Sequence, residues 1–507
     1  MKKVLSIILV TVMLLAVAVV PAHAAGETDG AFRVGETVYT TFSDAWAAAT
    51  SSTEGTIYVV KDYTINEATD RKKTLDTSKT VNIIGVKDET KTGREQYPTL
   101  TKAVSNDFVI SSLKGSLSFT DINIVASKLF ETTGSANINF NNVDAKIPDD
   151  GTNDGIFIKM WGSAGEPNVT IDKCTMTSLS SVRPCIIRLG SSNAKTATVT
   201  IKNSTLISKG AIATNADSGV LTVYSDNCTM NVDLENSKIY NETTGTTKSC
   251  IWTNAAKGTI NVTADSTSII GSTGEASADN PIMDGKGTET LSLSNGAKLI
   301  TGKEAALPVS ADTEGSTDLG FVCGDKIYKE SATAPAGEYT FLSYTDADFS
   351  MIEGASIRKV DPVGIRFGLN VSESFLNKVN AFAAFGMLAL PETLRGENEL
   401  TVSTEKVANQ PIAGTAKALY DEEKGTYTYF LALVGMKATK EAVTTEYASR
   451  GYFTVTYADE SSETFYTSFS ADKNVRSMYE TAVNVMAKGE EGAILDQIVA
   501  LAEGGTN

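Results

Sequence analysis

Histidine is almost absent from this chain of 507 residues, whose one histidine is His23. It lies in an N-terminal stretch that we expect to be removed, so the remaining chain would contain no imidazole. This excludes a histidine-containing catalytic triad, a histidine general base and an imidazole metal site. The sequence also contains no Gly-x-Ser-x-Gly elbow, P-loop, His-Glu-x-x-His motif or EF-hand loop.

Cysteine is scarce, and its pattern is not that of a cofactor site. The chain has five cysteines, an odd number, and no two of them share a Cys-x-x-Cys spacing. Neither a metal cluster nor a disulfide framework is therefore indicated. We expect the cysteines inside apolar strand patterns to be small, buried and unreactive.

Positive charge is also in deficit, with 44 Lys and Arg against 61 Asp and Glu and a net charge of -17. This balance argues against nucleic acid and anionic membrane surfaces as partners. The length allows two or more domains with cores of their own.

The N-terminus has the features of an export signal. Two lysines precede an almost wholly apolar run from 4 to 20, which Pro21 ends. Ala22-His23-Ala24 has the small-x-small pattern that signal peptidase requires, so we expect cleavage between Ala24 and Ala25 and a signal peptide over 1–24. The alternative is an uncleaved membrane anchor, since 17 apolar residues could just span a bilayer. With cleavage, the protein would be secreted, extracellular or attached to the cell surface, with no membrane insertion.

One pattern recurs between about 80 and 300: two apolar residues separated by one residue, a polar corner and a further apolar residue. Its anchors recur every 21 to 33 residues, a period typical of a solenoid in which each repeat is buried against its neighbours. Short alternating runs with many Thr, Val and Ile predict strands. We expect one interior column formed by Phe119, Phe140, Ile171, Ile201, Leu234 and Val262.

A second strand is expected in each repeat, at 156–159, 185–188, 211–214, 250–253 and 281–284. Alternation in this stack would place Cys185 and Trp252 inside and Thr253 outside. Before the repeats, residues 25–54 are expected to form an N-terminal cap. It would consist of a strand over 32–39 and a short helix over 41–49, with Thr41 or Ser43 as the N-cap residue.

On this rung periodicity, 55–302 resembles the pectate-lyase-like superfamily of right-handed parallel β-helices. The order of strand, Ala-rich helix and Gly-Thr-Ile strand at the N-terminus adds to the resemblance. The expected fold is mainly β: a right-handed parallel β-helix with a helical N-terminal cap, followed by a smaller C-terminal α+β module.

The repeats end near 302, and 303–350 reads as a linker or a set of terminal strands. Helical patterns at 374–382, 475–488 and 493–502 then indicate a separate α+β module over 351–507. Its motifs, among them Gly364-Ile-Arg-Phe367 and Tyr447-Ala-Ser-Arg-Gly-Tyr452, resemble an uncharacterised module of secreted proteins from Gram-positive anaerobes. The resemblance implies an extracellular setting and no known chemistry. We interpret its arginines as structural ion-pair formers; they are Arg358, Arg366, Arg450 and Arg476.

The candidate ligand-binding residues are Lys159, Arg188 and Asp284, which point outward from the second-strand stack if the rungs are in register. Lys159 and Arg188 would then lie ~4.8 Å apart, and two cations so close repel unless an anion lies beside them. The anion could be a bound uronate or sulfate, or a carboxylate of the chain itself, Asp150 or Asp154.

An acidic loop supplies the candidate metal ligands, Asp149, Asp150 and Asp154. Carboxylates and backbone carbonyl groups of this kind can hold Ca²⁺, although the spacing is not that of an EF-hand. The alternative is a solvated turn. No other cofactor is indicated.

These features favour a secreted or cell-surface protein without catalytic activity, a β-helical adhesive or scaffold that contacts a glycan. The expected partner is an extracellular glycan or a surface protein. The alternative is an enzyme: the resemblance to pectate lyases implies a polysaccharide lyase or glycoside hydrolase acting on an acidic polysaccharide, which needs no histidine.

Overall fold

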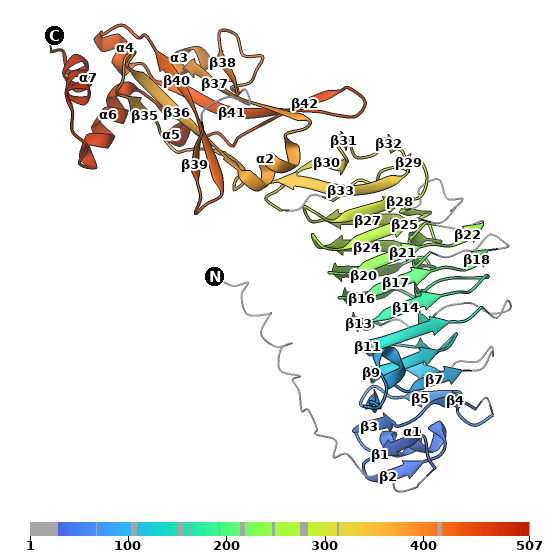
Figure 1. Cartoon of the computed structure of the whole chain (residues 1–507). Coiled ribbons are helices and arrows are strands. Elements are labelled where there is room, and N and C mark those ends of the chain that lie inside the picture. Colours follow the sequence, from blue (N-terminus) through green and yellow to red (C-terminus); the bar gives the residue numbers. More distant parts are fainter. Residues whose placement is uncertain are drawn as a thin grey trace.

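A long stack of strands is followed by a smaller module of strands and helices at its C-terminal end (Figure 1). This computed structural model describes residues 29–66, 68–102, 109–149, 157–162, 165–191, 193–212, 219–245, 249–273, 282–311, 314–412 and 418–505. The expected cleavage site at Ala24 and Ala25 lies outside the described residues.

The stack is a parallel β-helix, as the repeat predicted, and each rung contributes strands to three faces. The first two faces belong to one 21-stranded sheet that bends at the rung corners, and the third face is an eight-stranded sheet. The first face consists of β3 (Glu54–Val59), β6 (Thr80–Gly85), the start of β9 (Ser116–Val125), the start of β11 (Asn137–Ile147), β13 (Asn168–Asp172), β16 (Lys195–Lys202), β20 (Cys228–Glu235), β24 (Thr259–Ala264) and β27 (Thr288–Leu293). The second face consists of β4 (Tyr63–Ile65), β7 (Thr99–Lys102), the ends of β9 and β11, β14 (Thr175–Ser178), β17 (Thr205–Ser208), β21 (Lys238–Asn241), β25 (Ile269–Ser272) and β28 (Lys298–Thr301). The third face consists of β5 (Lys73–Leu75), β8 (Ile110–Leu113), β10 (Phe130–Thr132), β12 (Ile158–Met160), β15 (Ile187–Leu189), β19 (Leu221–Val223), β23 (Ile251–Thr253) and β26 (Met283–Gly285).

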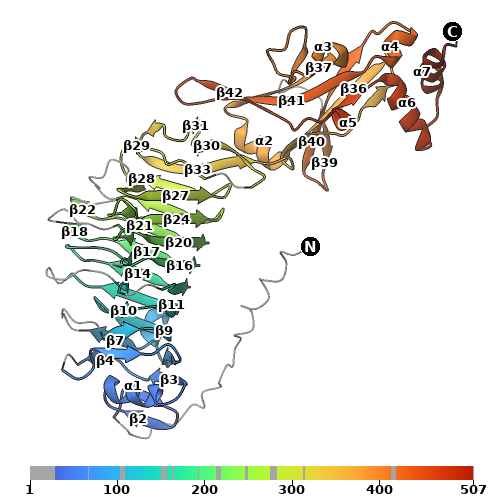
Figure 2. The same ribbon diagram turned by 180° about the vertical axis from the view of Figure 1, so that it is seen from behind.

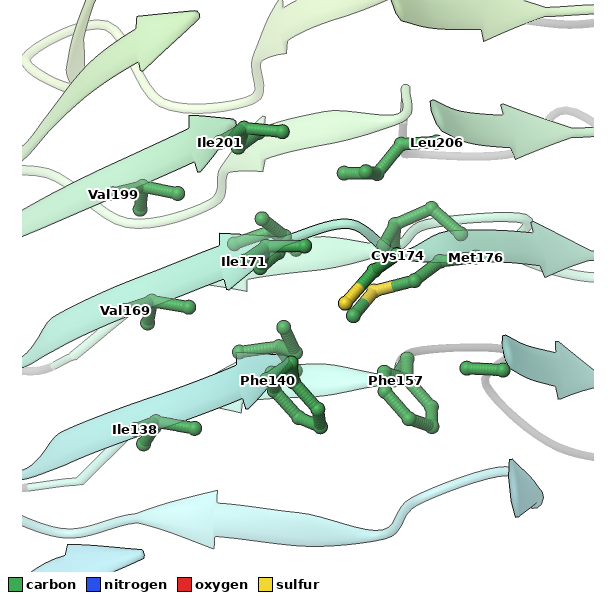
Figure 3. Packing of buried hydrophobic residues seen from close by; sticks show 14 of the residues in the cluster. Ile138, Phe140, Phe157, Val169, Ile171, Cys174, Met176, Val199, Ile201 and Leu206 are labelled. Atoms are coloured by element: carbon green, nitrogen blue, oxygen red, sulfur yellow. The ribbon is translucent and has the colours of Figure 1, made fainter. Parts of the chain in front are cut away.

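The interior column of the first face contains five of the expected anchors, each in register with the next. They are Phe119, Phe140, Ile171, Ile201 and Leu234, all of them buried. Figure 3 shows three of them, Phe140, Ile171 and Ile201. The rings of Phe119 and Phe140 are stacked, with their centroids 5.3 Å apart. Burial of such apolar side chains, at about 1.5–3 kcal/mol each, is the main force that holds the rungs together.

The sixth anchor was assigned to the wrong column. Leu234 is in register with Ala264, whereas Val262 is in register with Val232, two residues further back in the strand. A pattern that repeats every two residues fits equally well when it is shifted by two residues. The anchor position of this strand is occupied by a small alanine, so Ile260-x-Val262 matched the apolar pattern better than Val262-x-Ala264 did. The strand and its inward face were nevertheless predicted correctly.

A buried ladder of side chains closes consecutive corners between the first and second faces, from Cys174 to Ser268. The residue at the corner takes a positive φ, for example 48° at Asn203 and 47° at Asn236. Directly after it, Ser204 N–H donates to Ser237 Oγ over 3.1 Å, and Ser237 N–H donates to Ser268 Oγ over 3.1 Å. The rungs that carry Ser204, Ser237 and Ser268 therefore each supply the hydrogen-bond acceptor that the buried amide of the preceding rung needs.

On the third face, one expected strand and one expected orientation were wrong. The strand between β15 and β23 is β19, not 211–214, of which the described part, Ala211–Ile212, forms the separate short strand β18 beside β22 (Thr244–Gly245). Trp252 shares the outward column of Arg188, whereas Thr253 shares the inward column of Leu189. Both errors arose because a three-residue strand carries too few alternations to fix its register.

The cysteines are free thiols, and four of the five are buried. Cys185 and Cys250 are both fully buried, as expected. They are not equivalent positions, because Ile187 is in register with Leu221 and Leu221 with Ile251, which shifts the two cysteines by one residue. Burial raises the pKa of the Cys250 thiol, so it is a poor nucleophile.

An N-terminal cap covers the first rung (Figure 1). The expected strand over 32–39 is a hairpin of β1 (Phe32–Val34) and β2 (Thr37–Tyr39), and β1 pairs antiparallel with β3. The helix is α1 (Phe42–Thr50), and its N-cap is Thr41, whose hydroxyl accepts from Asp44 N–H. Its buried face, which includes Trp46, packs on the solenoid core.

The segment after β28 forms strands, which are β29 (Ala305–Ala306), β30 (Thr317–Cys323), β31 (Lys326–Tyr328), β32 (Thr333–Ala334) and β33 (Gly337–Tyr344). β33 pairs antiparallel with β28 and ends the parallel stack. Its alternate residues serve two cores: Tyr339 and Phe341 join the solenoid core, whereas Leu342 and Tyr344 join the core of the C-terminal module. The junction is therefore packed and is not a free linker.

The C-terminal module contains two five-stranded antiparallel sheets and the helices expected from the sequence (Figure 2). The first sheet contains β34 (Phe349–Met351), β35 (Ser356–Arg358), β36 (Gly364–Ser372), β39 (Leu419–Asp421) and β40 (Thr426–Val434). The second contains β37 (Ala383–Pro391), β38 (Ala408–Ile412), β41 (Tyr447–Thr456), β42 (Ser462–Tyr466) and β43 (Val475–Arg476). The helices are α2 (Glu373–Val379), α3 (Glu392–Arg395), α4 (Lys440–Thr444), α5 (Ala471–Asn474), α6 (Met478–Ala487) and α7 (Ala493–Glu503).

The arginines of this module are structural, but mostly not through ion pairs. Arg358 and Arg476 donate to backbone carbonyl groups, and Arg366 lies 4.9 Å from the centre of an aromatic ring. Among the described residues, only Arg450 of these four forms an ion pair, with Glu399 at 3.8 Å.

Candidate functional site

The outward column of the third face carries the charged residues singled out from the sequence. Lys159 on β12 is in register with Arg188 on β15, so the two cations are neighbours on adjacent parallel strands, as expected. The same column continues through Thr222 and Trp252 to Asp284 on β26. At ~4.8 Å per strand, Asp284 lies ~14 Å from Arg188 along the sheet, so it is not part of the cation pair.

The two cations are stabilised by different neighbours. Lys159 Nζ lies 3.1 Å from Glu131 Oε1 on the preceding strand, β10, and both side chains are about 20% exposed. Arg188 is only 4% exposed, and its guanidinium lies 3.8 Å from the centre of the Tyr224 ring and 5.5 Å from that of Trp161. An internal carboxylate was expected, but the one that the structure places here is Glu131. Asp150 and Asp154 lie outside the described residues.

Trp161 and Tyr224 form an aromatic pair beside the cations. Their ring centroids are 5.8 Å apart at an angle of 46°, and both side chains are partly exposed. They come from rungs on either side of Gly190, where an added Cβ would lie 2.3 Å from the Trp161 ring. A side chain at this position would therefore push Trp161 away from the cluster.

The aromatic pair was not predicted from the sequence, although a signal for it existed. Trp161 and Tyr224 each stand two residues after an outward position of the column, Lys159 and Thr222. Alternation places residues i and i+2 on the same face of a strand, so an extension of the pattern beyond the strand ends would have found them.

Behind this cluster lies a buried lysine. Lys195 is 2% exposed, and its Nζ lies 3.1 Å from the backbone oxygen of Trp161 and 3.5 Å from Thr132 Oγ1. Burial lowers its pKa to about 8, an effect only partly offset by Cys228 and Glu131. Lys195 thereby holds the backbone of Trp161 from inside the solenoid. It was not predicted, because an inward position normally carries an apolar residue.

The last rung contains a carboxylate with a perturbed pKa. Glu289 accepts a hydrogen bond from the hydroxyl of Thr253, which itself accepts from Gly287 N–H over 2.8 Å. Burial raises the pKa of Glu289, the bond from Thr253 lowers it, and the negative charge of Asp284 raises it. This environment favours the protonated acid more than water does.

The proposed calcium ligands are only partly described. Asp149 accepts hydrogen bonds from the backbone N–H of Ser181 over 2.9 Å and from its hydroxyl over 2.7 Å. Asp150 and Asp154 lie outside the described residues. Within the described ranges, no group of three or more His, Cys, Asp or Glu side chains could hold a metal ion.

No family model and no curated protein matches this chain. Among solved structures, the crystal structure of the Acinetobacter phage vB_ApiP_P1 tailspike protein is similar over 83% of this chain and 81% of that chain, with 11% sequence identity and a TM-score of 0.26. A similarity this low supports no conclusion about the site. In the described part of the chain, none of the helices combines the length and the apolar character needed to cross a membrane.

Proposed function

We propose that the protein is a secreted or cell-surface scaffold without catalytic activity, and that its third face contacts an acidic extracellular glycan. The observation that carries this proposal is the cluster of Lys159, Arg188, Trp161 and Tyr224. Partly exposed rings offer flat apolar surfaces to the C–H groups of a sugar, and the partly exposed ammonium group of Lys159 offers a partner for a carboxylate or sulfate, whereas Arg188 is buried and supports the Tyr224 ring from beneath its face.

The rigidity of the scaffold supports this interpretation. The strands that carry the cluster are paired in register on both sides, and Gly190 and Lys195 fix the position of Trp161. Such a preorganised surface loses little conformational entropy when it binds a polymer.

Tryptophan fluorescence provides a direct test, because Trp161 is a partly exposed member of the cluster. Residues 25–507 are titrated with polygalacturonate, with and without Ca²⁺, and dextran serves as the neutral control. We expect a saturable, salt-sensitive change in fluorescence with polygalacturonate and no change with dextran. We also expect no unsaturated or reducing-end products.

A matched pair of variants locates the binding. Trp161→Ala should weaken binding about 10-fold, since one cation–π and ring contact contributes about 0.5–2 kcal/mol. Lys202→Met, which removes an exposed lysine of the first face, should leave binding unchanged. No saturable binding, or equal effects of the two variants, would contradict the proposal.

Glu289 favours a second candidate, a lyase or hydrolase acting on the same class of glycan. A partly buried carboxylate with a raised pKa beside a second carboxylate is a common arrangement for acid–base catalysis. The test is product formation from polygalacturonate at pH 5 and pH 7. If products appear and Glu289→Gln abolishes them, the enzyme replaces the scaffold as the function.

A further inference from the structure

The outer surface of the first face carries two long columns of hydroxyl and amide side chains. One column runs in register from Thr80 on β6 to Thr290 on β27, and the other from Asn82 to Ser292 on the same strands. Every position in both columns is Ser, Thr or Asn, except Asp233. All these side chains are at least partly exposed.

The spacing of this array follows from the geometry of parallel strands. Neighbouring strands lie ~4.8 Å apart, and residues i and i+2 of one strand lie ~6.6 Å apart. The hydroxyl and amide groups therefore form a regular two-dimensional grid on the outside of eight consecutive strands.

Hydrogen bonds between rungs hold parts of the grid in a fixed orientation. Asn261 Nδ2 donates to Asn231 Oδ1 over 2.9 Å, and Asn168 Nδ2 donates to Asn137 Oδ1 over 3.2 Å. Each amide keeps further donor and acceptor capacity toward solvent. The face is thus preorganised and can both donate and accept hydrogen bonds.

We infer that this hydroxyl–amide face binds an ordered surface of an uncharged polysaccharide, in which hydroxyl groups repeat in two dimensions. The inference is independent of the acidic-glycan site on the third face. A polyanion would find no cation in the two columns and would meet Asp233, and a second copy of this chain would bring its own net charge of -17. An uncharged, hydroxyl-rich surface needs no cation and is not repelled by the negative charge of this chain.

The weakness of each contact explains why the partner has to be an ordered surface. A single exposed hydrogen bond contributes at most about 0.5–1.5 kcal/mol, because it replaces one made to water. Neither column contains an aromatic ring that could hold one sugar alone. Many contacts formed together by two rigid, periodic surfaces produce affinity, whereas a flexible soluble chain loses entropy at each residue.

A pull-down assay with insoluble polysaccharides tests the inference. Residues 25–507 are mixed with microcrystalline chitin or cellulose, and the protein in the pellet is measured. We expect binding to at least one of the two. Thr198→Glu combined with Thr200→Glu puts two negative charges in the middle of the grid and should reduce the bound fraction at least 10-fold.

Two further variants separate an effect on binding from an effect on folding. Thr205→Glu on the outer side of β17 makes the same substitution on the second face and should bind as the wild type does. Thr198→Val keeps the β-branched shape of the side chain and removes its hydroxyl, so it should weaken binding without a change in thermal unfolding.

The results expected in this pull-down assay differ from those expected for the acidic-glycan site on the third face. Soluble polygalacturonate should not release the protein from the pellet, because it would occupy the third face. Absence of the wild type from both pellets, equal binding of the double variant, or an oligomer in solution that the double variant abolishes would each overturn the inference.

Discussion

Replacement of the buried Lys195 by Met should stabilise the solenoid at neutral pH. Burial lowers the pKa of Lys195 to about 8 from the usual ~10.4 of a lysine. At 1.36 kcal/mol per pKa unit, the protonated side chain costs the folded state about 3 kcal/mol. Met removes that cost but leaves the Trp161 carbonyl without its donor, a loss of about 1 kcal/mol. The net gain is about 2 kcal/mol.

The pH dependence distinguishes this effect from ordinary repacking. Below pH 8 both the folded and the unfolded state carry the proton, so the folded state bears the full penalty. Between about pH 8 and pH 10.4 the unfolded state binds more protons than the folded state, so the stability of the wild type rises with pH. The advantage of the Met variant should therefore fall to about zero near pH 9.5.

Urea unfolding followed by tryptophan fluorescence measures the effect in the full chain. All three tryptophans lie within the first 252 residues, so the signal reports the solenoid and not the C-terminal module. Lys202→Met is the control on the same strand: it removes an exposed lysine paired with Glu235 at 2.9 Å and should change stability by less than about 0.5 kcal/mol. A Lys195→Met variant that is less stable at pH 7, or a gain that does not change with pH, would refute the reasoning.

Three other predictions concern the core and the junction. Ser237→Ala should lower the free energy of unfolding by about 1–3 kcal/mol in the same urea assay, because a buried amide loses its acceptor; no change would contradict the role of the ladder. Cys185 and Cys250 should react with a thiol reagent only after denaturation, and fast labelling of the native protein would show that they are accessible. A fragment over 316–507 should melt at a higher temperature than one over 345–507, which lacks the strands whose side chains complete its core; equal melting by circular dichroism would contradict this.

Much of the solenoid could be predicted from the sequence, because one signal recurs in every rung. The alternation of apolar and polar residues identified the strands and the inward faces, and the spacing of Phe119, Phe140 and Ile171 identified the rungs. The prediction failed where the alternation of apolar and polar residues carries little information. At Ala264 a small residue fills the anchor position, and β19 is too short to show its register.

The candidate site was only half predictable for a related reason. Lys159 and Arg188 stand inside strands, and their pairing follows from register alone. Trp161 and Tyr224 stand beyond the strand ends, and the partner of Lys159 is Glu131, 28 residues earlier in the chain. Lys195 is a charged residue in an inward position, which a pattern of apolar residues cannot indicate.

The antiparallel strands at the two ends of the solenoid restrict how its length can change. β1 on β3 and β33 on β28 run against the direction of the stack, so at each end one face is closed to a further parallel rung, the first face at β3 and the second face at β28. Homologous proteins of different length would therefore gain or lose whole turns between these ends, since a partial turn would leave at least one of the three faces without a strand at that level. Each inserted turn would move the C-terminal module ~4.8 Å further from the N-terminal cap. The solenoid would then act as a spacer whose reach is set in fixed steps by the number of its repeats.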